Sequence, residues 1–192
     1  MPAAQPEALQ FLLSRRSHPA KTLRAPGPDR AALEPLLTAA LRVPDHGKLE
    51  PWRLIVLARP ALKRLAAAAA ARAEALTMPA DQAAKGISQF ADSPLCVAVV
   101  SSPKPSDKAP EVEQLLSAGA VALSLLNAAL AAGWGAAWLT GWPAYDAEFR
   151  AEALGLAAGE RVVGFVHVGT AAGVSPERPR PDLAALTEWR GF

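Results

Sequence analysis

The chain has 192 residues, a formal net charge of +2 and 51% hydrophobic residues. This length and composition describe one domain with a substantial core and exclude disorder for most of the chain. No lysine- or arginine-rich run stands out, which argues against a nucleic-acid partner, and the single cysteine, Cys96, excludes an internal disulfide framework and a multi-cysteine metal site.

Hydrophobic periodicity predicts helices and strands that follow one another along residues 1–192. The predicted helices span residues 6–14, 29–41, 61–76, 81–90, 111–132 and 146–154, and the predicted strands span residues 52–57, 95–100, 134–139 and 161–168. Asp29 is a good N-cap for the second helix, whereas Pro44 and Pro51 keep the segment before the first strand in a loop. This order predicts a small sheet layered with helices, α+β or α/β in class.

Two segments outside this pattern are rich in proline. Residues 101–110 contain three prolines and two lysines, and we predict a mobile flap there. Residues 169–192 form a proline-rich tail with a short helical piece at residues 183–189. A tail without a core of its own and a long apolar helix together predict a homodimer.

The stretch from residue 115 to residue 139 carries no charged side chain and has the composition of a membrane span. Gly133 and Gly135 interrupt it, which leaves a run near the lower limit of about 17–25 residues for spanning. We therefore favour a helix buried in a core or a subunit interface and expect no membrane partner. The N-terminal segment has no signal-peptide pattern, and we expect a cytoplasmic protein.

Several common functional patterns are absent from the sequence. Gly133-Trp-Gly135 lacks the third glycine of a dinucleotide fingerprint and lies between a helix and a strand in the wrong order. The three histidines show no ligand spacing, so we predict no metal site. Ser17, Asp45 and His46 lack the nucleophile-elbow context of a catalytic triad.

Cationic side chains instead gather at the ends of the first two predicted helices. These residues are Arg15 and Arg16 beside Ser17, followed by Arg42, His46 and Lys48. Guanidinium groups next to a hydroxyl suit a phosphate monoester. Trp52 and Trp138 favour a ligand with an anionic tail and a flat apolar body, and a solvated basic surface is the alternative.

The order of these motifs resembles the flavin-dependent nitroreductase family. The resemblance rests on Arg15-Arg-Ser17, on Arg42-Val-Pro-Asp-His46 followed by Pro51-Trp52, on residues 133–141 and on residues 162–169. It extends over nearly the whole chain, and the Pro-Asp-His form points to the short YdjA-like branch. The resemblance implies a nitroreductase-like three-layer α+β fold, with a small mixed central sheet flanked by helices, and an intertwined homodimer that binds FMN at its subunit interface.

The same resemblance implies roles for individual residues and no protein catalytic residue, because the flavin N5 carries the chemistry. Arg15, Arg16 and Ser17 would hold the phosphate and ribityl chain, and Arg180 or Arg178 would reach the phosphate from the tail. Arg42 and His46 would contribute from their loop across the dimer. Trp138, Leu139 and Thr140 would line the flavin face and the N5 edge. Lys48 and Glu50 depart from the family pattern, in which an asparagine and a glutamine are common. A lysine near the flavin N1/O2 edge would stabilise the reduced, anionic flavin.

The implied activity is hydride transfer from NAD(P)H through FMN to a small acceptor such as a nitroaromatic or a quinone, with ping-pong kinetics. Two alternatives stay open at this point. One is a different flavin enzyme on the same fold, such as a small-substrate dehydrogenase. The other is a non-enzymatic dimer that binds flavin or another ligand.

Overall fold

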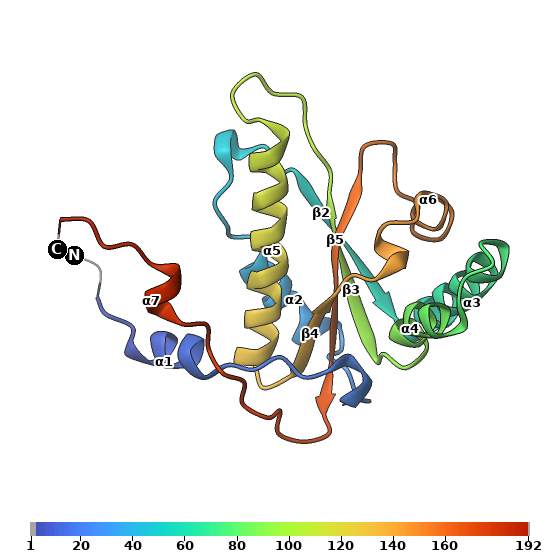
Figure 1. Ribbon diagram of the computed structural model, residues 1–192, viewed down its shortest axis with the longest axis horizontal. Coiled ribbons are helices and arrows are strands. Elements are labelled where there is room, and N and C mark those ends of the chain that lie inside the picture. Colours follow the sequence, from blue (N-terminus) through green and yellow to red (C-terminus); the bar gives the residue numbers. More distant parts are fainter. Residues whose placement is uncertain (1–2, 192) are drawn as a thin grey trace.

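The computed structural model describes residues 3–191 and contains a five-stranded sheet between two helical layers (Figure 1). The helices are α1 (Pro6–Ser14), α2 (Arg30–Ala40), α3 (Arg59–Ala75), α4 (Ala80–Ala91), α5 (Glu111–Ala131), α6 (Ala147–Leu154) and α7 (Leu183–Leu186). The strands are β1 (Leu23–Arg24), β2 (Trp52–Ala58), β3 (Leu95–Ser101), β4 (Gly135–Leu139) and β5 (Arg161–Ala171). Three short 3₁₀ turns, η1 (Ala20–Thr22), η2 (His46–Lys48) and η3 (Trp142–Ala144), connect them.

The long strand β5 is the centre of the sheet. It pairs with β3, β4 and β1, and β2 pairs with the other edge of β3. All of these described pairings are antiparallel, so the expectation of a mixed sheet was wrong. The connections explain this result: the two helices α3 and α4 return the chain to the end of the sheet where β2 finished, and β3 then runs back beside β2. Strands β3 and β4 share a direction, but β5 separates them.

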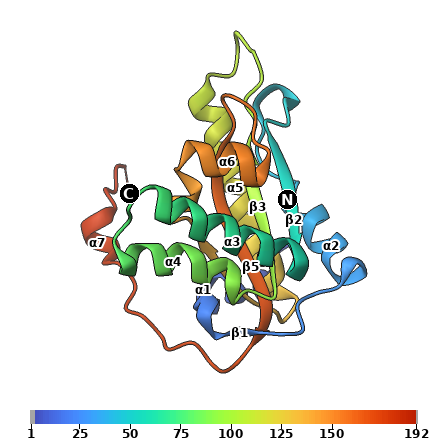
Figure 2. The ribbon, with the colours of Figure 1, turned by 90° about the vertical axis from the view of Figure 1, so that its right-hand side faces the viewer.

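Each face of the sheet has its own hydrophobic core. Because side chains alternate along a strand, Val97 and Val99 of β3 pack with α2 and α5, whereas Cys96 and Ala98 pack with α3, α4 and α6. Figure 2 shows α3, α4 and α6 in front of the sheet with α5 behind it. The three layers that the sequence predicted are therefore confirmed.

Helix α5 is the uncharged stretch that resembled a membrane span. By length and composition alone it is long and apolar enough to cross a membrane. One side of it packs on β3, β4, β5 and α2, and Val121, Ala122 and Leu125 are completely buried there. Its opposite side leaves Leu116 and Leu123 exposed, at 69% and 46%. The described fold therefore uses α5 as a core helix with one apolar side uncovered.

The two ends of the described chain lie outside the three layers. Helices α1 and α7 contain no buried residue, and in Figure 1 both lie away from the sheet on the same side of α5. Leu9, Leu12 and Leu13 of α1 are each more than half exposed. These helices form without a core partner inside the protomer.

His167 is a fully buried polar side chain in the middle of β5. Its Nδ1 lies 2.9 Å from the Ser93 hydroxyl oxygen, and its Nε2 has no hydrogen-bond partner among the described residues. Burial lowers the pKa of the imidazole from 6.5 to about 4, because the charged form has no solvation in the core.

This histidine makes the fold sensitive to mild acid. Between pH 6.5 and pH 4 the unfolded chain binds the imidazole proton and the folded chain does not, so the free energy of unfolding falls as the pH falls through this range. We expect a loss of about 2 kcal/mol at pH 4.5 relative to pH 7, measured by urea unfolding. A His167→Asn variant should be less stable at pH 7 and should lose much less on acidification. An equal loss in both proteins would contradict this assignment.

Candidate functional site

Three segments that are distant in the sequence form one cavity of about 430 Å³. The segment after α1 supplies Arg15–Pro19, β4 supplies Ala137–Leu139, and the tail supplies Ser175, Pro176 and Arg178. The backbone N–H of His18 donates a hydrogen bond of 2.9 Å to Ala136, which attaches the first segment to the edge of β4. We call this cavity the arginine cradle.

The arginine cradle contains polar atoms that the protein itself does not satisfy. Arg15 Nε, Arg16 Nε, His18 Nδ1 and Ser175 Oγ are buried and have no hydrogen-bond partner among the described residues. The far end of the Arg15 side chain is engaged, since its Nη2 donates to the Ser17 hydroxyl over 3.0 Å. Unpaired buried polar groups are costly, and all four belong to residues that line one cavity, which favours a site for a polar ligand.

The charge of the arginine cradle is strongly positive. Burial lowers the pKa of Arg15, and the nearby charges of Arg16 and Arg180 lower this pKa further. Arg178 lines the cavity itself, so both tail arginines lie close to the α1 end. The carboxylate of Glu177 opposes them, with its Oε1 3.9 Å from Arg16 Nη1. Such a cluster of guanidinium groups is suited to a phosphate or another compact anion.

Two further cavities share Leu139 with the arginine cradle. One, of about 310 Å³, also has Pro19 as a wall and is lined by Lys21 and Lys85. The other, of about 490 Å³, lies between α4 and residues 138–142. The three cavities together surround the end of β4. We call the cavities of about 310 and 490 Å³ together the α4 groove.

One face of helix α4 forms the wall of the α4 groove. This face consists of Gln82, Lys85, Gly86 and Gln89, whose spacing places them on one side of a helix. Gln89 Oε1 and Trp142 Nε1 are buried there without a partner among the described residues. The α4 groove is therefore bordered by an unpaired acceptor on Gln89, an unpaired donor on Trp142 that lies against Gly86, and two lysines, Lys21 and Lys85.

Glycines allow the two indole rings of this region to pack closely. A side chain at Gly86 would overlap the Trp142 ring, and a side chain at Gly164 would overlap the Trp138 ring. Trp138 Nε1 also donates to the Val163 carbonyl over 3.3 Å. Backbone contact therefore fixes the positions of both rings.

The structure brings together many of the residues that the sequence singled out. Arg15, Arg16, Ser17, Trp138 and Leu139 line the arginine cradle, Thr140 lines the adjoining α4 groove, and Arg180 acts electrostatically on Arg15. Sequence reasoning missed Lys85, Gly86, Gln89, Trp142 and Ser175. The helical spacing of the α4 residues was readable, but nothing in it distinguished a ligand-facing side from any other amphipathic face.

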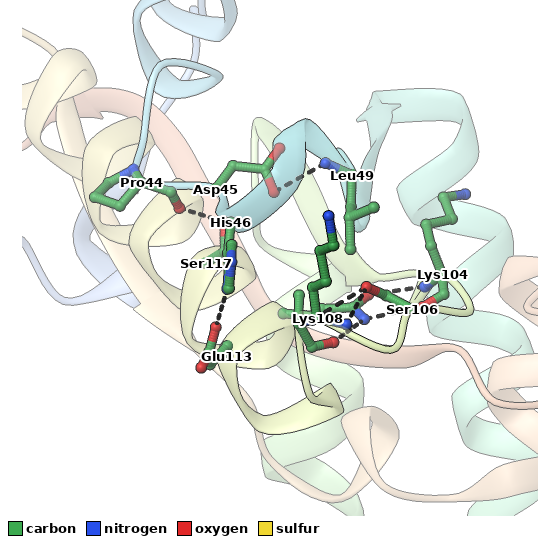
Figure 3. A network of polar contacts seen from close by, with 11 residues as sticks. Pro44, Asp45, His46, Leu49, Lys104, Ser106, Lys108, Glu113 and Ser117 are labelled. Carbon is green, nitrogen blue, oxygen red and sulfur yellow. Dashed lines mark hydrogen bonds and ion pairs between the residues drawn. The ribbon is translucent and has the colours of Figure 1, made fainter.

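Arg42 and His46 are not part of the arginine cradle within the protomer. Their loop lies beside the first turns of α5, where His46 Nδ1 is 2.7 Å from Glu113 Oε2 and Ser117 donates to the Pro44 carbonyl over 2.7 Å (Figure 3). In Figure 1 the segment after α1 passes the opposite end of α5. The cofactor roles of Arg42 and His46 stay predictions that require a second protomer.

Lys48 and Glu50 lie in the same loop and have left-handed backbones, with φ of 54° and 47°. Non-glycine residues rarely adopt this conformation. The Asp45 carboxylate stabilises it by accepting hydrogen bonds from the backbone N–H groups of Leu49 and Glu50 at 3.2 and 2.8 Å. Lys48 lines neither the arginine cradle nor the α4 groove, whereas Lys85 lines the α4 groove.

The loop at residues 101–110 lies beside the same end of α5. The buried Gln114 side chain bonds both backbone groups of Lys104, at 2.8 and 2.9 Å, and the Ala109 carbonyl at 2.9 Å. Ser106 accepts from the backbone N–H groups of Lys108 and Ala109 (Figure 3). The mobility of this loop stays a prediction.

Comparisons with known proteins agree with this architecture. Residues 12–170 match the model of the nitroreductase family, and the chain therefore belongs to that family. A candidate NAD(P)H nitroreductase of Haemophilus influenzae is 34% identical over 165 residues, which cover 85% of this chain and 88% of the relative. The Escherichia coli K12 protein YdjA, described in the same terms, is 32% identical over 164 residues, with the same coverage.

Solved structures show the same fold at lower identity. A nitroreductase-like family protein from Bacillus cereus superposes with a TM-score of 0.81 at 22% identity and covers 100% of both chains. A variant of NfnB from Sphigopyxis sp. strain HMH, described as an FMN- and NADPH-dependent nitroreductase, has a TM-score of 0.75 at 21% identity and covers 96% of this chain and 99% of that one. Both support the nitroreductase-like α+β fold.

The contact between Gly86 and Trp142 provides a test of the α4 groove. Alanine is favoured over glycine within a helix by about 1 kcal/mol, but the added methyl group would overlap the indole ring. We expect overpacking to dominate, with Gly86→Ala destabilising the fold by about 1–3 kcal/mol in urea unfolding. The smaller ring of Trp142→Phe should reduce this cost. The same cost in both backgrounds would show that the two residues are not in contact.

Proposed function

We propose that this protein is an FMN-dependent oxidoreductase that transfers hydride from NAD(P)H to a small acceptor such as a nitroaromatic or a quinone. The observation that carries the proposal is the convergence of unpaired buried polar atoms and arginines in one cavity that continues into the α4 groove at Leu139. An elongated ligand with a phosphate at one end and a flat ring at the other matches this arrangement. FMN has this shape and charge.

The arginine cradle fits the phosphate end. A phosphate dianion offers several acceptor oxygens to the unpaired N–H groups of Arg15 and Arg16, and the Ser175 hydroxyl can donate to it. Arg178 and Arg180 add positive charge from the tail. A neutral ligand would leave these guanidinium groups uncompensated, and that difference supports a phosphorylated cofactor.

The α4 groove fits the ring end. The unpaired Gln89 Oε1 provides an acceptor, which complements the imide N–H of a flavin. Bound FMN would supply the hydride-transfer chemistry. Lys85 would place a positive charge beside the ring and so favour its reduced, anionic form. Trp138 and Leu139 would hold the ring between apolar walls.

The names of relatives support the choice of substrates. The Haemophilus influenzae and Escherichia coli relatives are described as candidate NAD(P)H nitroreductases, and NfnB as dependent on FMN and NADPH. Two substrates that use one cofactor site in turn give ping-pong kinetics.

We further propose that the protein is a homodimer. Apolar side chains are uncovered on α1, on α5 and in the tail, and they include Leu12, Leu116, Leu123 and Leu186. A cavity of about 680 Å³ with a mainly apolar lining runs beside α5 at Gly119. A second copy would cover these surfaces. It would also provide a route by which Arg42 and His46 of one protomer reach the cofactor of the other.

The direct test of the function is the absorbance spectrum of the purified protein. We expect the two bands of oxidised flavin, release of FMN on denaturation, and parallel lines in double-reciprocal plots of NAD(P)H oxidation at several acceptor concentrations. Intersecting lines would argue against ping-pong turnover. A colourless protein that does not take up added FMN would overturn the proposal.

A variant of the arginine cradle tests the phosphate assignment. Arg16→Ala removes a charge-assisted donor, and we expect its dissociation constant for FMN to rise about 30-fold, as for the loss of about 2 kcal/mol. Its affinity for riboflavin, which lacks the phosphate, should change little. Arg30→Ala is the matched control, because Arg30 pairs with Glu34 on the exposed face of α2. Equal losses for FMN and riboflavin would refute the phosphate role of Arg16.

A further inference from the structure

A carboxylate outside the lining of the arginine cradle approaches one of its arginines. Glu177 stands in the tail between Pro176 and Arg178, both of which line the cavity. Its Oε1 lies 3.9 Å from Arg16 Nη1 and also accepts a hydrogen bond of 3.0 Å from the backbone N–H of Arg178. The carboxylate is thus oriented by its own backbone toward the guanidinium of Arg16.

This carboxylate opposes the chemistry of the rest of the cavity. The other charged groups, Arg15, Arg16, Arg178 and Arg180, favour an anion, whereas Glu177 repels one. A phosphate bound at Arg16 would lie within a few ångströms of Glu177, so the two anions would compete for the same guanidinium. The Glu177 side chain is 69% exposed, and solvent therefore weakens this competition without abolishing it.

We propose that Glu177 is an affinity-determining residue of the phosphate site. It acts as an internal anion that neutralises Arg16 when no ligand is present, and it lowers the affinity for the phosphorylated ligand below what the arginines alone would give. The inference rests on the proposed function in that FMN is the ligand. It assigns to the tail two opposing effects, because Arg178 and Arg180 attract the phosphate and Glu177 repels it.

A single change of charge tests the proposal. Glu177→Gln keeps the size of the side chain and an oxygen that can accept from the Arg178 N–H, but it removes the negative charge. We expect the dissociation constant for FMN, measured by titration of the flavin-stripped full-length protein, to fall five- to tenfold, on the order of 1 kcal/mol. The dissociation constant for riboflavin should stay the same, since no phosphate is present to be repelled.

Salt and a second tail carboxylate provide the controls. The gain in FMN affinity should shrink as the salt concentration rises, because the interaction is electrostatic and exposed. Glu188→Gln is the matched variant: Glu188 is an exposed tail carboxylate that pairs with Arg190, whereas Glu177 pairs with Arg16 of the arginine cradle. It should leave both affinities unchanged.

A double variant separates competition for Arg16 from a general charge effect. In an Arg16→Ala background, Glu177→Gln should improve FMN affinity by a smaller factor than in the unaltered protein, because the shared guanidinium is gone and only the screened repulsion of the phosphate remains. Unchanged or weaker FMN binding by Glu177→Gln alone would overturn the inference, and so would an equal gain for riboflavin. Failure of the unaltered protein to bind FMN would overturn the proposed function and this inference together, whereas the other outcomes concern Glu177 only.

Discussion

The antiparallel pairing of β4 with β5 positions the whole candidate site. Strand β5 is held by β3 along one edge and is buried over most of its length, so it is a rigid support. The register of β4 on β5 places Trp138 opposite Val166 and Leu139 opposite Phe165. Since the backbone of His18 bonds to Ala136, the arginines after α1 are fixed to the same strand. A slip of one residue would move Leu139 to the opposite face of the sheet.

A site supported in this way can keep groups that are unfavourable on their own. The charge of Arg16 disfavours the charged form of Arg15, and the neighbouring His18 Nδ1 and Ser175 Oγ have no hydrogen-bond partner among the described residues. Such groups lower stability, which the two cores on either side of the sheet must offset. The usual reason for a protein to keep them is ligand binding. Glu177 belongs to the same balance, because its carboxylate reduces the repulsion while no ligand is bound.

The regular part of the fold was predictable from the sequence because its periodicity is strong. The helix expected at residues 111–132 is α5, and the strand expected at residues 95–100 is β3. Strand β1 was missed, since it has only two residues and stands next to a turn that contains Pro26 and Pro28. The antiparallel sheet was not predictable, because strand direction depends on how each connection crosses the layers.

The candidate site was predictable only where its residues are contiguous. Arg15, Arg16 and Ser17 form a local motif, and all three line one cavity in the structure, while their role in binding a cofactor stays a prediction. The contribution of α4 arises from long-range packing, which the sequence does not reveal. The sequence therefore suggested Lys48 as the lysine near the flavin ring, whereas in the structure Lys85 lines the α4 groove. Glu177 had no sequence signal either, because a single glutamate in an irregular tail resembles any solvated charge.

The position of the second loop gives the strongest reason to consider two protomers. Hydrogen bonds from His46 to Glu113 and from Ser117 to the Pro44 carbonyl attach this loop to the first turns of α5, while the segment that carries Arg15 and Arg16 passes the opposite end of the helix (Figure 1). A helix of 21 residues is about 30 Å long, and neither Arg42 nor His46 lines the cradle of its own chain. The uncovered apolar side of the same helix lies between the two regions. If Arg42 and His46 contact the cofactor as the family resemblance implies, an antiparallel copy packed along α5 is the simplest arrangement that brings each loop to the opposite cradle.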